Sequence, residues 1–440
     1  MEFKEKLLSS FFALQEAVSI DDNPLIEERR HQAFKTFEEK GFPNKKQEAW
    51  KYTSISPLLS EDYVIFPRGQ VGIHPNDVKK YFLYEMDTYK IVFIDGVYSP
   101  FLSNTHHDGF DVNLLSVALN QKKYQKTIGR YYDRIASSKE SLVALNTAYA
   151  HEGAYIYIPK NQDPLSPIEI LHFSSGDCAA LWLQPRNLII AEQGAEVQII
   201  ERHQSLVEHP VVTNSVTEIY AGQNANIEYY KIQDDLDSAS LIDNTFIHQA
   251  KDSNVSIHTS SLGGKIVRNN LTFYQSGQGI NSILKGITVL ERNQHVDHST
   301  LVHHAHPNCE SHQDYKGIFT GSSQGIFNGK ILVDRIAQKT NAFQQNNNII
   351  LSDEALVNAK PQLEIFADDV RCSHGCTVGQ LDQNALFYTR SRGIPLKEAE
   401  ALLTYAFANN VLESVSIPIL KKHISHQIAA KFGVEMGFGI

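Results

Sequence analysis

The chain resembles itself at a short, regular interval. A segment that begins at Ala191 (AEQGAEVQII) returns at Ala221 (AGQNANIEYY) and, shortened by one residue, at Ala250 (AKDSNVSIH), so the offsets are 30 and 29 residues. Each copy is a turn of Gly, Asn or Ser followed by a strand-like run. This spacing is typical of one coil of a parallel β-solenoid, in which each coil buries its inner face against its neighbours. We therefore expect a mainly β fold, a right-handed parallel β-helix; a β-sandwich is the alternative that periodicity alone leaves open.

Helical patterns flank the repeat region on both sides. Apolar residues recur at three- and four-residue intervals from Lys4 to about Lys40. Two further stripes follow Pro395: Ala399, Leu402, Leu403, Ala406 and Phe407, then Leu420, Ile424 and Ile428 up to Gly433. The sequence therefore predicts an N-terminal helical and mixed domain over residues 1–145, the β-helix core over 146–388 and a C-terminal helical domain over 389–440.

Composition narrows the classes of function. The net charge of -10 is spread without a basic cluster, which argues against nucleic acid as a partner. Four cysteines without regular spacing favour a reducing compartment over a disulfide framework. No signal-peptide pattern and no apolar run of about 18 residues is seen, so we expect a soluble cytoplasmic protein without a membrane anchor.

Cys372, His374 and Cys376 stand two residues apart near the end of the repeat region. In an extended strand such residues share one face with roughly 6.5 Å between neighbours. Thiolate and imidazole are ligands that soft and borderline metals prefer, so the stripe is a candidate metal or sulfur site. The alternative is that the cysteines only cap the last coil as small apolar residues.

A second cluster places six of the nineteen histidines between His295 and His312, with Cys309 in the same stretch. Such a cluster can chelate a metal, and His304 and His306 would share a strand face; a histidine-rich exposed coil face is the alternative. Gly264-Lys265 and Gly329-Lys330 lack the surrounding residues of a P-loop. An ATP-driven step would therefore have to come from a partner.

Six motifs, in this order, resemble the SufB/SufD family of iron-sulfur cluster assembly proteins. They are WKYT at Trp50, LNTA at Leu145, AQKTNAFQ at Ala337, PQLEI at Pro361, DDVRCSHG at Asp368 and FYTRSRGI at Phe387. The resemblance spans nearly the whole chain. The first and fifth motifs resemble the SufD branch of the family in particular.

The resemblance implies a non-ATPase scaffold subunit, not an enzyme, in a SufBCD complex of the SUF system. It implies a right-handed β-helix with helical domains at both ends, pairing with a SufB-like subunit through the β-helix, and binding of the ATPase SufC by the C-terminal helices. Leu402, Leu403 and Phe407 are the candidates for that second contact. An iron-sulfur cluster or iron would be transient and shared with the partner. Neither a cluster nor iron is expected on the isolated chain. A homodimer of the isolated chain is compatible with the resemblance.

The resemblance also ranks the candidate ligands. Cys372 and His374 match the family's Cys-Ser-His-Gly, with His374 the stronger candidate for cluster assembly or iron entry. Cys376 stands where SufD relatives usually carry Ala, and His304 matches the family pattern without an assigned role, so both are weaker candidates. Gly375 stands where the SufB branch carries Glu, so this chain lacks that acidic ligand.

Two other functions remain as alternatives. A β-helix is also the architecture of many carbohydrate-active enzymes, although these are usually secreted and lack helical tails of this kind. A free-standing metal-binding protein built on the histidine cluster is the other alternative. Iron, zinc and sulfide content of the isolated chain would separate these readings, because a scaffold should carry little metal without its partners.

Overall fold

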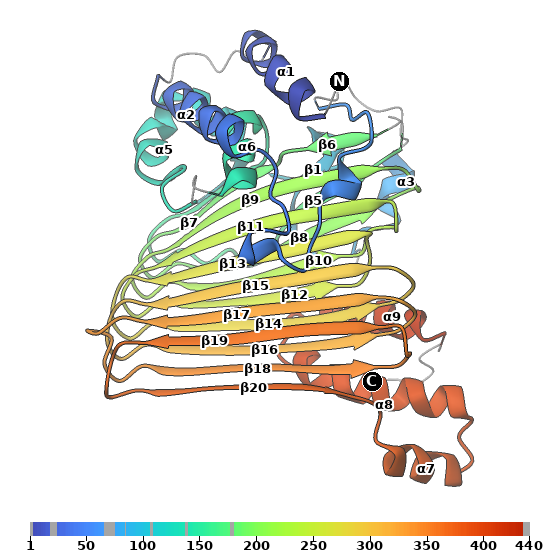
Figure 1. Cartoon of the computed structure of the whole chain (residues 1–440). Helices are drawn as coiled ribbons and strands as arrows, with labels where there is room; N and C mark the ends of the chain where they lie inside the picture. Colours follow the sequence, from blue (N-terminus) through green and yellow to red (C-terminus); the bar gives the residue numbers. More distant parts are fainter. Residues whose placement is uncertain are drawn as a thin grey trace.

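The protein is a β-solenoid built from two facing sheets, with helices at both ends of the chain (Figure 1). The computed structural model describes residues 3–17, 24–65, 75–83, 85–105, 109–136, 140–176 and 180–433. The expected mainly β solenoid with flanking helices is confirmed, and the sandwich alternative is wrong, because nearly all strand pairs are parallel.

The first sheet runs, in spatial order, β2 (Val97–Tyr98), β1 (Tyr89–Ile94), β5 (Ile168–Ser174), β8 (Glu196–Ser205), β10 (Asn226–Gln233), β12 (Asn254–Ser261), β14 (Asn281–Leu290), β16 (Glu310–Phe319), β18 (Asn341–Ile350) and β20 (Arg371–Gly379). The second runs β19 (Leu356–Ile365), β17 (Gln324–Val333), β15 (His295–His304), β13 (Ile266–Gln275), β11 (Ala239–Gln249), β9 (Val211–Ala221), β7 (Arg186–Ala191), β4 (Ala154–Ile158) and β3 (Asp111–Leu114), with β6 (Leu181–Leu183) beside β9. The chain alternates between the sheets, so each coil adds one strand to each.

Strand register follows the sequence repeat. Asn226 of β10 pairs with Glu196 of β8 on one side and with Asn254 of β12 on the other. These are the positions that the repeat aligns once the single deletion is allowed for. The turn before each strand contains a residue with positive φ, at Gly194 (66°), Asn224 (54°) and Asp252 (56°). Gly, Asn and Asp are the residues that tolerate this left-handed conformation best, so the turn chemistry sets the repeat.

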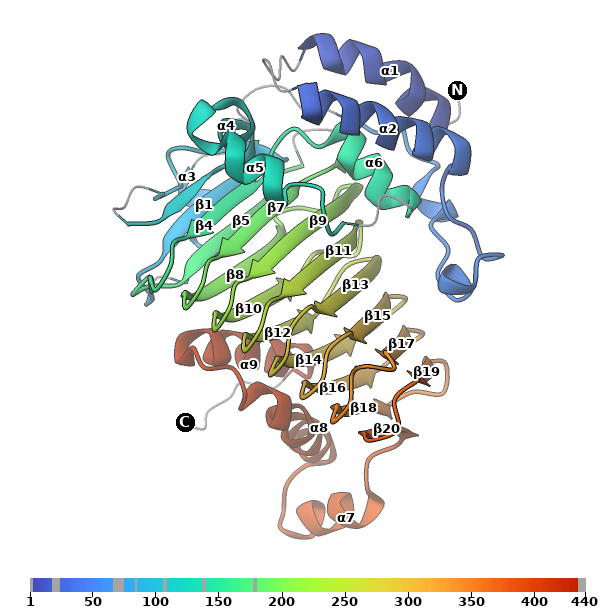
Figure 2. The ribbon, with the colours of Figure 1, turned by 90° about the vertical axis from the view of Figure 1, so that its left-hand side faces the viewer.

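Helices flank the two sheets, and most of them cover an outer face (Figure 1, Figure 2). They are α1 (Phe3–Ala17), α2 (Pro24–Lys40), α3 (Pro75–Lys79), α4 (Leu115–Asn120), α5 (Gln125–Tyr131), α6 (Ser141–Tyr149), α7 (Gln383–Ser391), α8 (Leu396–Leu412) and α9 (Pro418–Lys431), with short 3-10 turns η1 (Glu48–Trp50), η2 (Ser56–Leu58) and η3 (Lys122–Tyr124). The N-terminal helices pack over the early coils of the second sheet, where Phe11 and Phe34 belong to one core cluster with Val212 and Ile242. α8 and α9 pack over the outer face of the first sheet (Figure 2).

The segment after α2 crosses the later strands of the second sheet and carries the WKYT motif (Figure 1). Trp50 is buried beneath Arg268 of β13, with the guanidinium 4.1 Å from the ring centroid. Arg268 in turn forms an ion pair with Asp297 of β15, which also accepts a hydrogen bond from Thr53. The motif thus fastens the N-terminal segment to the outside of the solenoid.

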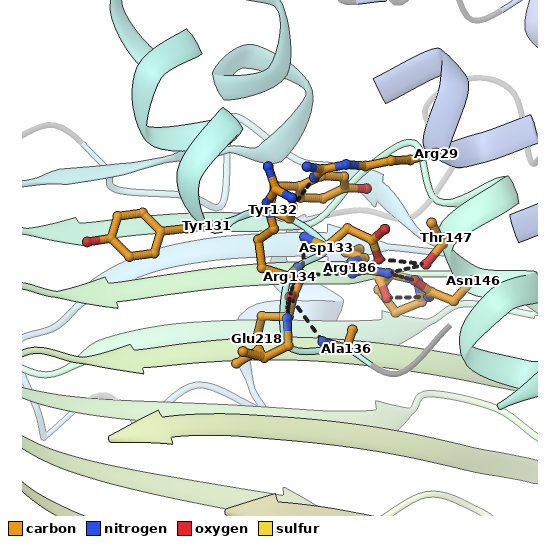
Figure 3. Close-up of polar contacts among 12 residues, drawn as sticks. Arg29, Tyr131, Tyr132, Asp133, Arg134, Ala136, Asn146, Thr147, Arg186 and Glu218 are labelled. Atoms are coloured by element: carbon orange, nitrogen blue, oxygen red, sulfur yellow. Dashed lines mark hydrogen bonds and ion pairs between the residues drawn. The ribbon is translucent and has the colours of Figure 1, made fainter. Parts of the chain in front are cut away.

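A buried charge network joins the loop after α5 to the early coils (Figure 3). The Glu218 carboxylate of β9 accepts hydrogen bonds from the backbone N–H groups of four consecutive residues: Asp133, Arg134, Ile135 and Ala136. It also pairs with Arg186 of β7 at 2.7 Å, and both side chains are fully buried. Arg186 makes a second ion pair with Asp133 at 3.0 Å. One carboxylate therefore holds a loop and neutralises a buried guanidinium.

The C-terminal helices differ in part from their predicted faces. α9 buries Leu420, Ile424 and Ile428, as its stripe predicts. α8 instead buries a face of mostly small residues, Ala399, Ala401, Thr404, Ala408, Val411 and Leu412, and leaves Leu402 exposed. Small side chains let α8 approach the sheet closely, so its larger residues turn outward.

Candidate functional site

The last coil of the solenoid is open. β19 and β20 end their sheets, and each pairs with a neighbouring strand on one side only. Ile365 of β19 and Val378 of β20 lie in register with buried residues of the preceding coil, yet they are 37% and 48% exposed. Within the described residues, no further strand covers this edge. The solenoid therefore presents unpaired backbone groups and apolar side chains at one end.

The Cys372, His374 and Cys376 stripe lies on β20, at this open edge. Its members pair with Ala342, Gln344 and Asn346 of β18, all of which are buried and face the interior of the solenoid. The stripe therefore occupies one face of one strand, in line with the inner column of the coil. Behind His374 that column continues through Gln344 to Gln313 of β16.

The three side chains differ in their surroundings. Cys372 is half-buried against the core cluster that contains Val333 and Ala342, whereas His374 and Cys376 are exposed. The Cys376 thiol lies 3.8 Å from the amide oxygen of Asn346. Burial raises the pKa of both thiols, so each must lose a proton before it can bind a metal. The stripe offers two protonated thiols and one imidazole to solvent, and its ligand atoms do not converge on a single point.

His304 lies apart from the stripe, in the second sheet and two strands before its end. Its side chain is fully buried and its Nε2 atom lies 2.9 Å from the Ser311 hydroxyl. Burial lowers the pKa of His304 to about 3, so this imidazole is neutral. Ser311 belongs to β16, so the hydrogen bond joins the two sheets across the interior.

The other histidines of that region point to separate partners. His298 contacts Thr288 at 2.8 Å, and burial lowers the pKa of His298 to about 4. His303 pairs with Asp334 at 3.0 Å. His295 lies 3.0 Å from the Thr53 hydroxyl, and His312 stacks on Phe343. The structure does not bring this cluster to a common point.

The C-terminal candidates lie on α8. Leu402 is exposed, while Leu403 and Phe407 are half-buried. The Phe407 ring lies 4.7 Å from the Lys316 ammonium of β16, and the Phe407 carbonyl accepts a hydrogen bond from the same group at 2.9 Å. Phe407 therefore also helps to hold α8 on the sheet.

Two aromatic residues that were not among the candidates for the ATPase contact are more exposed than Leu402, Leu403 and Phe407. Phe387 and Tyr388 of α7 are 75% and 60% exposed, and α7 stands away from both sheets (Figure 2). They belong to the FYTRSRGI motif. Two adjacent aromatic residues in a short polar helix could have indicated an exposed contact surface from the sequence.

Family models match almost the entire chain. The model described as SUF system FeS cluster assembly, SufBD core domain, matches residues 173–407, and the SufBD protein N-terminal region matches residues 1–170. The chain belongs to the SufBD family. The first match covers most of the solenoid together with α7 and much of α8, so the family's core includes the open coil and the stripe on β20.

Named relatives of this SufBD chain agree with the family models. An iron-sulfur cluster assembly SufBD family protein of Synechocystis is 32% identical, over 95% of this chain and 93% of the relative. The iron-sulfur cluster assembly protein SufD of Escherichia coli is 28% identical, over 98% and 97%, and SufD of Bacillus subtilis is 29% identical, over 70% and 71%. By its family this is an assembly protein of the SUF system. Among its described helices, none has the length and apolar character to cross a membrane.

Sequence reasoning missed a buried group in this SufBD chain. His172, Glu201 and His203 bring three potential ligand atoms within 4.8 Å of one another. They lie on β5 and β8, whose register pairs His172 directly with His203. The two histidines are 31 residues apart, one more than the repeat of 30, so extending the repeat by one coil aligns His203 with Phe173 instead.

Proposed function

We propose that the chain is a non-catalytic scaffold subunit that helps to build nascent iron-sulfur clusters in the cytoplasm. It pairs with a SufB-type subunit through the open end of the solenoid and with a SufC-type ATPase through the C-terminal helices. The observation that carries the proposal is the stripe on β20, an incomplete ligand set on an unpaired edge strand of a SufBD protein. The free thiols of Cys309, Cys372 and Cys376 suit a reducing compartment.

The open edge supports a partner at β19 and β20. Soluble proteins usually protect an edge strand with charge, proline or a cover, because its backbone groups pair readily with another chain. Here β19 carries such features in Lys360, Pro361 and Glu364, but Ile365 and Val378 are apolar and remain exposed at the inner side of the edge. A second solenoid joined edge to edge would continue both sheets and cover these side chains. SufB, as a member of the same family, has the matching architecture.

The ligand count supports a shared site. Metal ions bound by thiolate and imidazole, such as zinc, usually take four ligands. The stripe supplies only Cys372 and His374, with Cys376 as a weaker third. An iron atom or nascent cluster at the edge would be cargo in transit, held between the two subunits. In this arrangement His374, which is exposed, is the ligand that meets incoming iron.

A charge at the open edge tests the pairing. We expect Val378→Asp to reduce recovery of the SufB-type subunit by at least about tenfold in co-expression pull-downs, since a buried unpaired charge destabilises an interface by several kcal/mol. Leu165→Asp is the matched control, because Leu165 is 94% exposed in the loop between β4 and β5, near the other end of the solenoid. Equal recovery of SufB by Val378→Asp and wild type would contradict pairing through this edge.

The ATPase contact has a separate test on α7. We expect Phe387→Asp to weaken recovery of the SufC-type ATPase. Helical content should not change, because the Phe387 ring is exposed and packs little against the rest of the free chain. Phe407→Asp should also weaken recovery, but it should loosen α8 as well, because Phe407 contacts Lys316. Circular dichroism separates the two effects. If Phe387→Asp recovers as much ATPase as wild type does, α7 is not part of the interface.

A further inference from the structure

Two imidazoles and a carboxylate meet inside the solenoid, far along the sheets from β20. His172 lies on β5, and Glu201 and His203 lie on β8, all three facing the space between the sheets. The Glu201 Oε1 atom lies 3.7 Å from His172 Nε2 and 3.6 Å from His203 Nε2. Ligand atoms around a tetrahedral zinc ion, with bonds of about 2.0–2.1 Å, stand roughly 3.3 Å apart, so each imidazole nitrogen is already close to the required distance from the carboxylate. All three atoms lie within 4.8 Å of one another.

The Nε2 atoms of both imidazoles are buried, and Glu201, their acidic neighbour, lies beyond hydrogen-bond distance. The His172 side chain is 10% exposed and that of His203 7% exposed, and neither Nε2 atom has a hydrogen-bond partner. A buried polar atom left in this state costs about 1–3 kcal/mol, which calls for an explanation. Neutral imidazole binds metal ions through a ring nitrogen such as Nε2, so both residues are of a type that can act as ligands.

The carboxylate is held in place by other residues. Glu201 Oε1 accepts a hydrogen bond from Asn187 at 3.1 Å, and Oε2 accepts one from Tyr229 at 2.7 Å. The Lys231 ammonium lies 3.8 Å from Oε2 and forms its closer ion pair with Asp243. Partners of this kind orient metal ligands in proteins.

Space is available beside the imidazoles. A cavity of about 30 Å³ is lined by both His172 and His203, which is enough for a small ion with a water molecule. The rings are stacked, with centroids 4.6 Å apart and planes 9° from parallel. Coordination therefore requires one imidazole to turn toward Glu201, which does not itself line the cavity.

We propose that His172, Glu201 and His203 form an internal binding site for one divalent transition-metal ion of the Zn²⁺ and Fe²⁺ class. Two imidazoles and one carboxylate are a ligand set that these ions favour, and a water in the cavity would complete the coordination. The site goes beyond the scaffold function and does not depend on it. It needs no ligand from a partner, so it loads in the isolated chain and departs from the sequence-based expectation of little metal there. That expectation stays for the shared site on β20.

Cobalt binding to the full-length chain tests this site. The background carries Cys372→Ala, His374→Ala and Cys376→Ala, which removes the stripe on β20. After removal of metal with a chelator, Co²⁺ should bind with one equivalent per chain and give visible absorption bands of nitrogen and oxygen ligands. His172→Phe keeps a ring stacked on Phe93 and His203 but removes one ligand atom. It should weaken cobalt binding by at least about tenfold, the loss seen even for residues that only orient a ligand.

His248→Phe is the matched control, because His248 also lies between two aromatic rings, those of Tyr220 and Tyr274, with centroids 5.9 and 5.8 Å away, and it is not part of the site. It should bind cobalt as the background does. If His172→Phe fails to fold, X-ray absorption of the cobalt-loaded background still decides, since the site predicts two imidazole ligands and no sulfur. The proposal is overturned by a background protein that binds no cobalt, by equal affinity of folded His172→Phe, or by sulfur ligation.

Discussion

Replacing Glu218 with leucine lowers the free energy of unfolding by about 3–5 kcal/mol, the range observed when one member of a buried ion pair is removed. The loss has two sources. Arg186 keeps its full charge inside the protein with Asp133 as its remaining acidic partner. The four backbone N–H groups from Asp133 to Ala136 also lose the carboxylate that accepts their hydrogen bonds.

Urea denaturation of the full chain measures the shift. Hydrogen exchange gives a local readout, because the amides of Arg134, Ile135 and Ala136 should exchange faster in Glu218→Leu. Glu192→Leu is the matched control, since Glu192 is only partly buried and its contacts with Tyr131 and Tyr157 are long, at 3.3 and 3.5 Å. A denaturation midpoint and exchange rates equal to those of wild type would show that Glu218 does not anchor the loop.

Replacing His374 with alanine should lower cluster formation by at least about tenfold, as expected when a metal-binding residue is lost. His374 is exposed on an edge strand, so its removal leaves no cavity and the fold should be unchanged. Cys376→Ala, two residues away on the same face, should retain activity. The measurement is complementation of cluster assembly in cells that lack the native subunit. Equal growth with His374→Ala and wild type would remove His374 from the site.

Much of the fold follows from local chemistry. The repeat at Ala191, Ala221 and Ala250 predicts the strand register because each coil needs a left-handed turn, and Gly194, Asn224 and Asp252 supply it. The period-two spacing of Cys372, His374 and Cys376 likewise predicts that they share one strand face. These features depend on residues close together in the sequence.

Other features depend on contacts that local patterns do not encode. The apolar stripe through Leu402 predicts the buried face of α8. The structure instead buries Ala401, Thr404 and Ala408, because the helix lies close against β14 and β16. The meeting of His172 with His203 depends on which strand of the early coils pairs with which. The hydrogen bonds from backbone N–H groups to Glu218 join a strand to a loop more than 80 residues away in the sequence.

Co-purification tests the central claim most directly. The tagged chain, expressed with its native SUF operon, should recover both a SufB-type subunit and a SufC-type ATPase. Val378→Asp should lose the first and keep the second, whereas Phe387→Asp should do the reverse. A folded wild-type chain that recovers neither protein would contradict the account of a scaffold subunit with two separate partner surfaces.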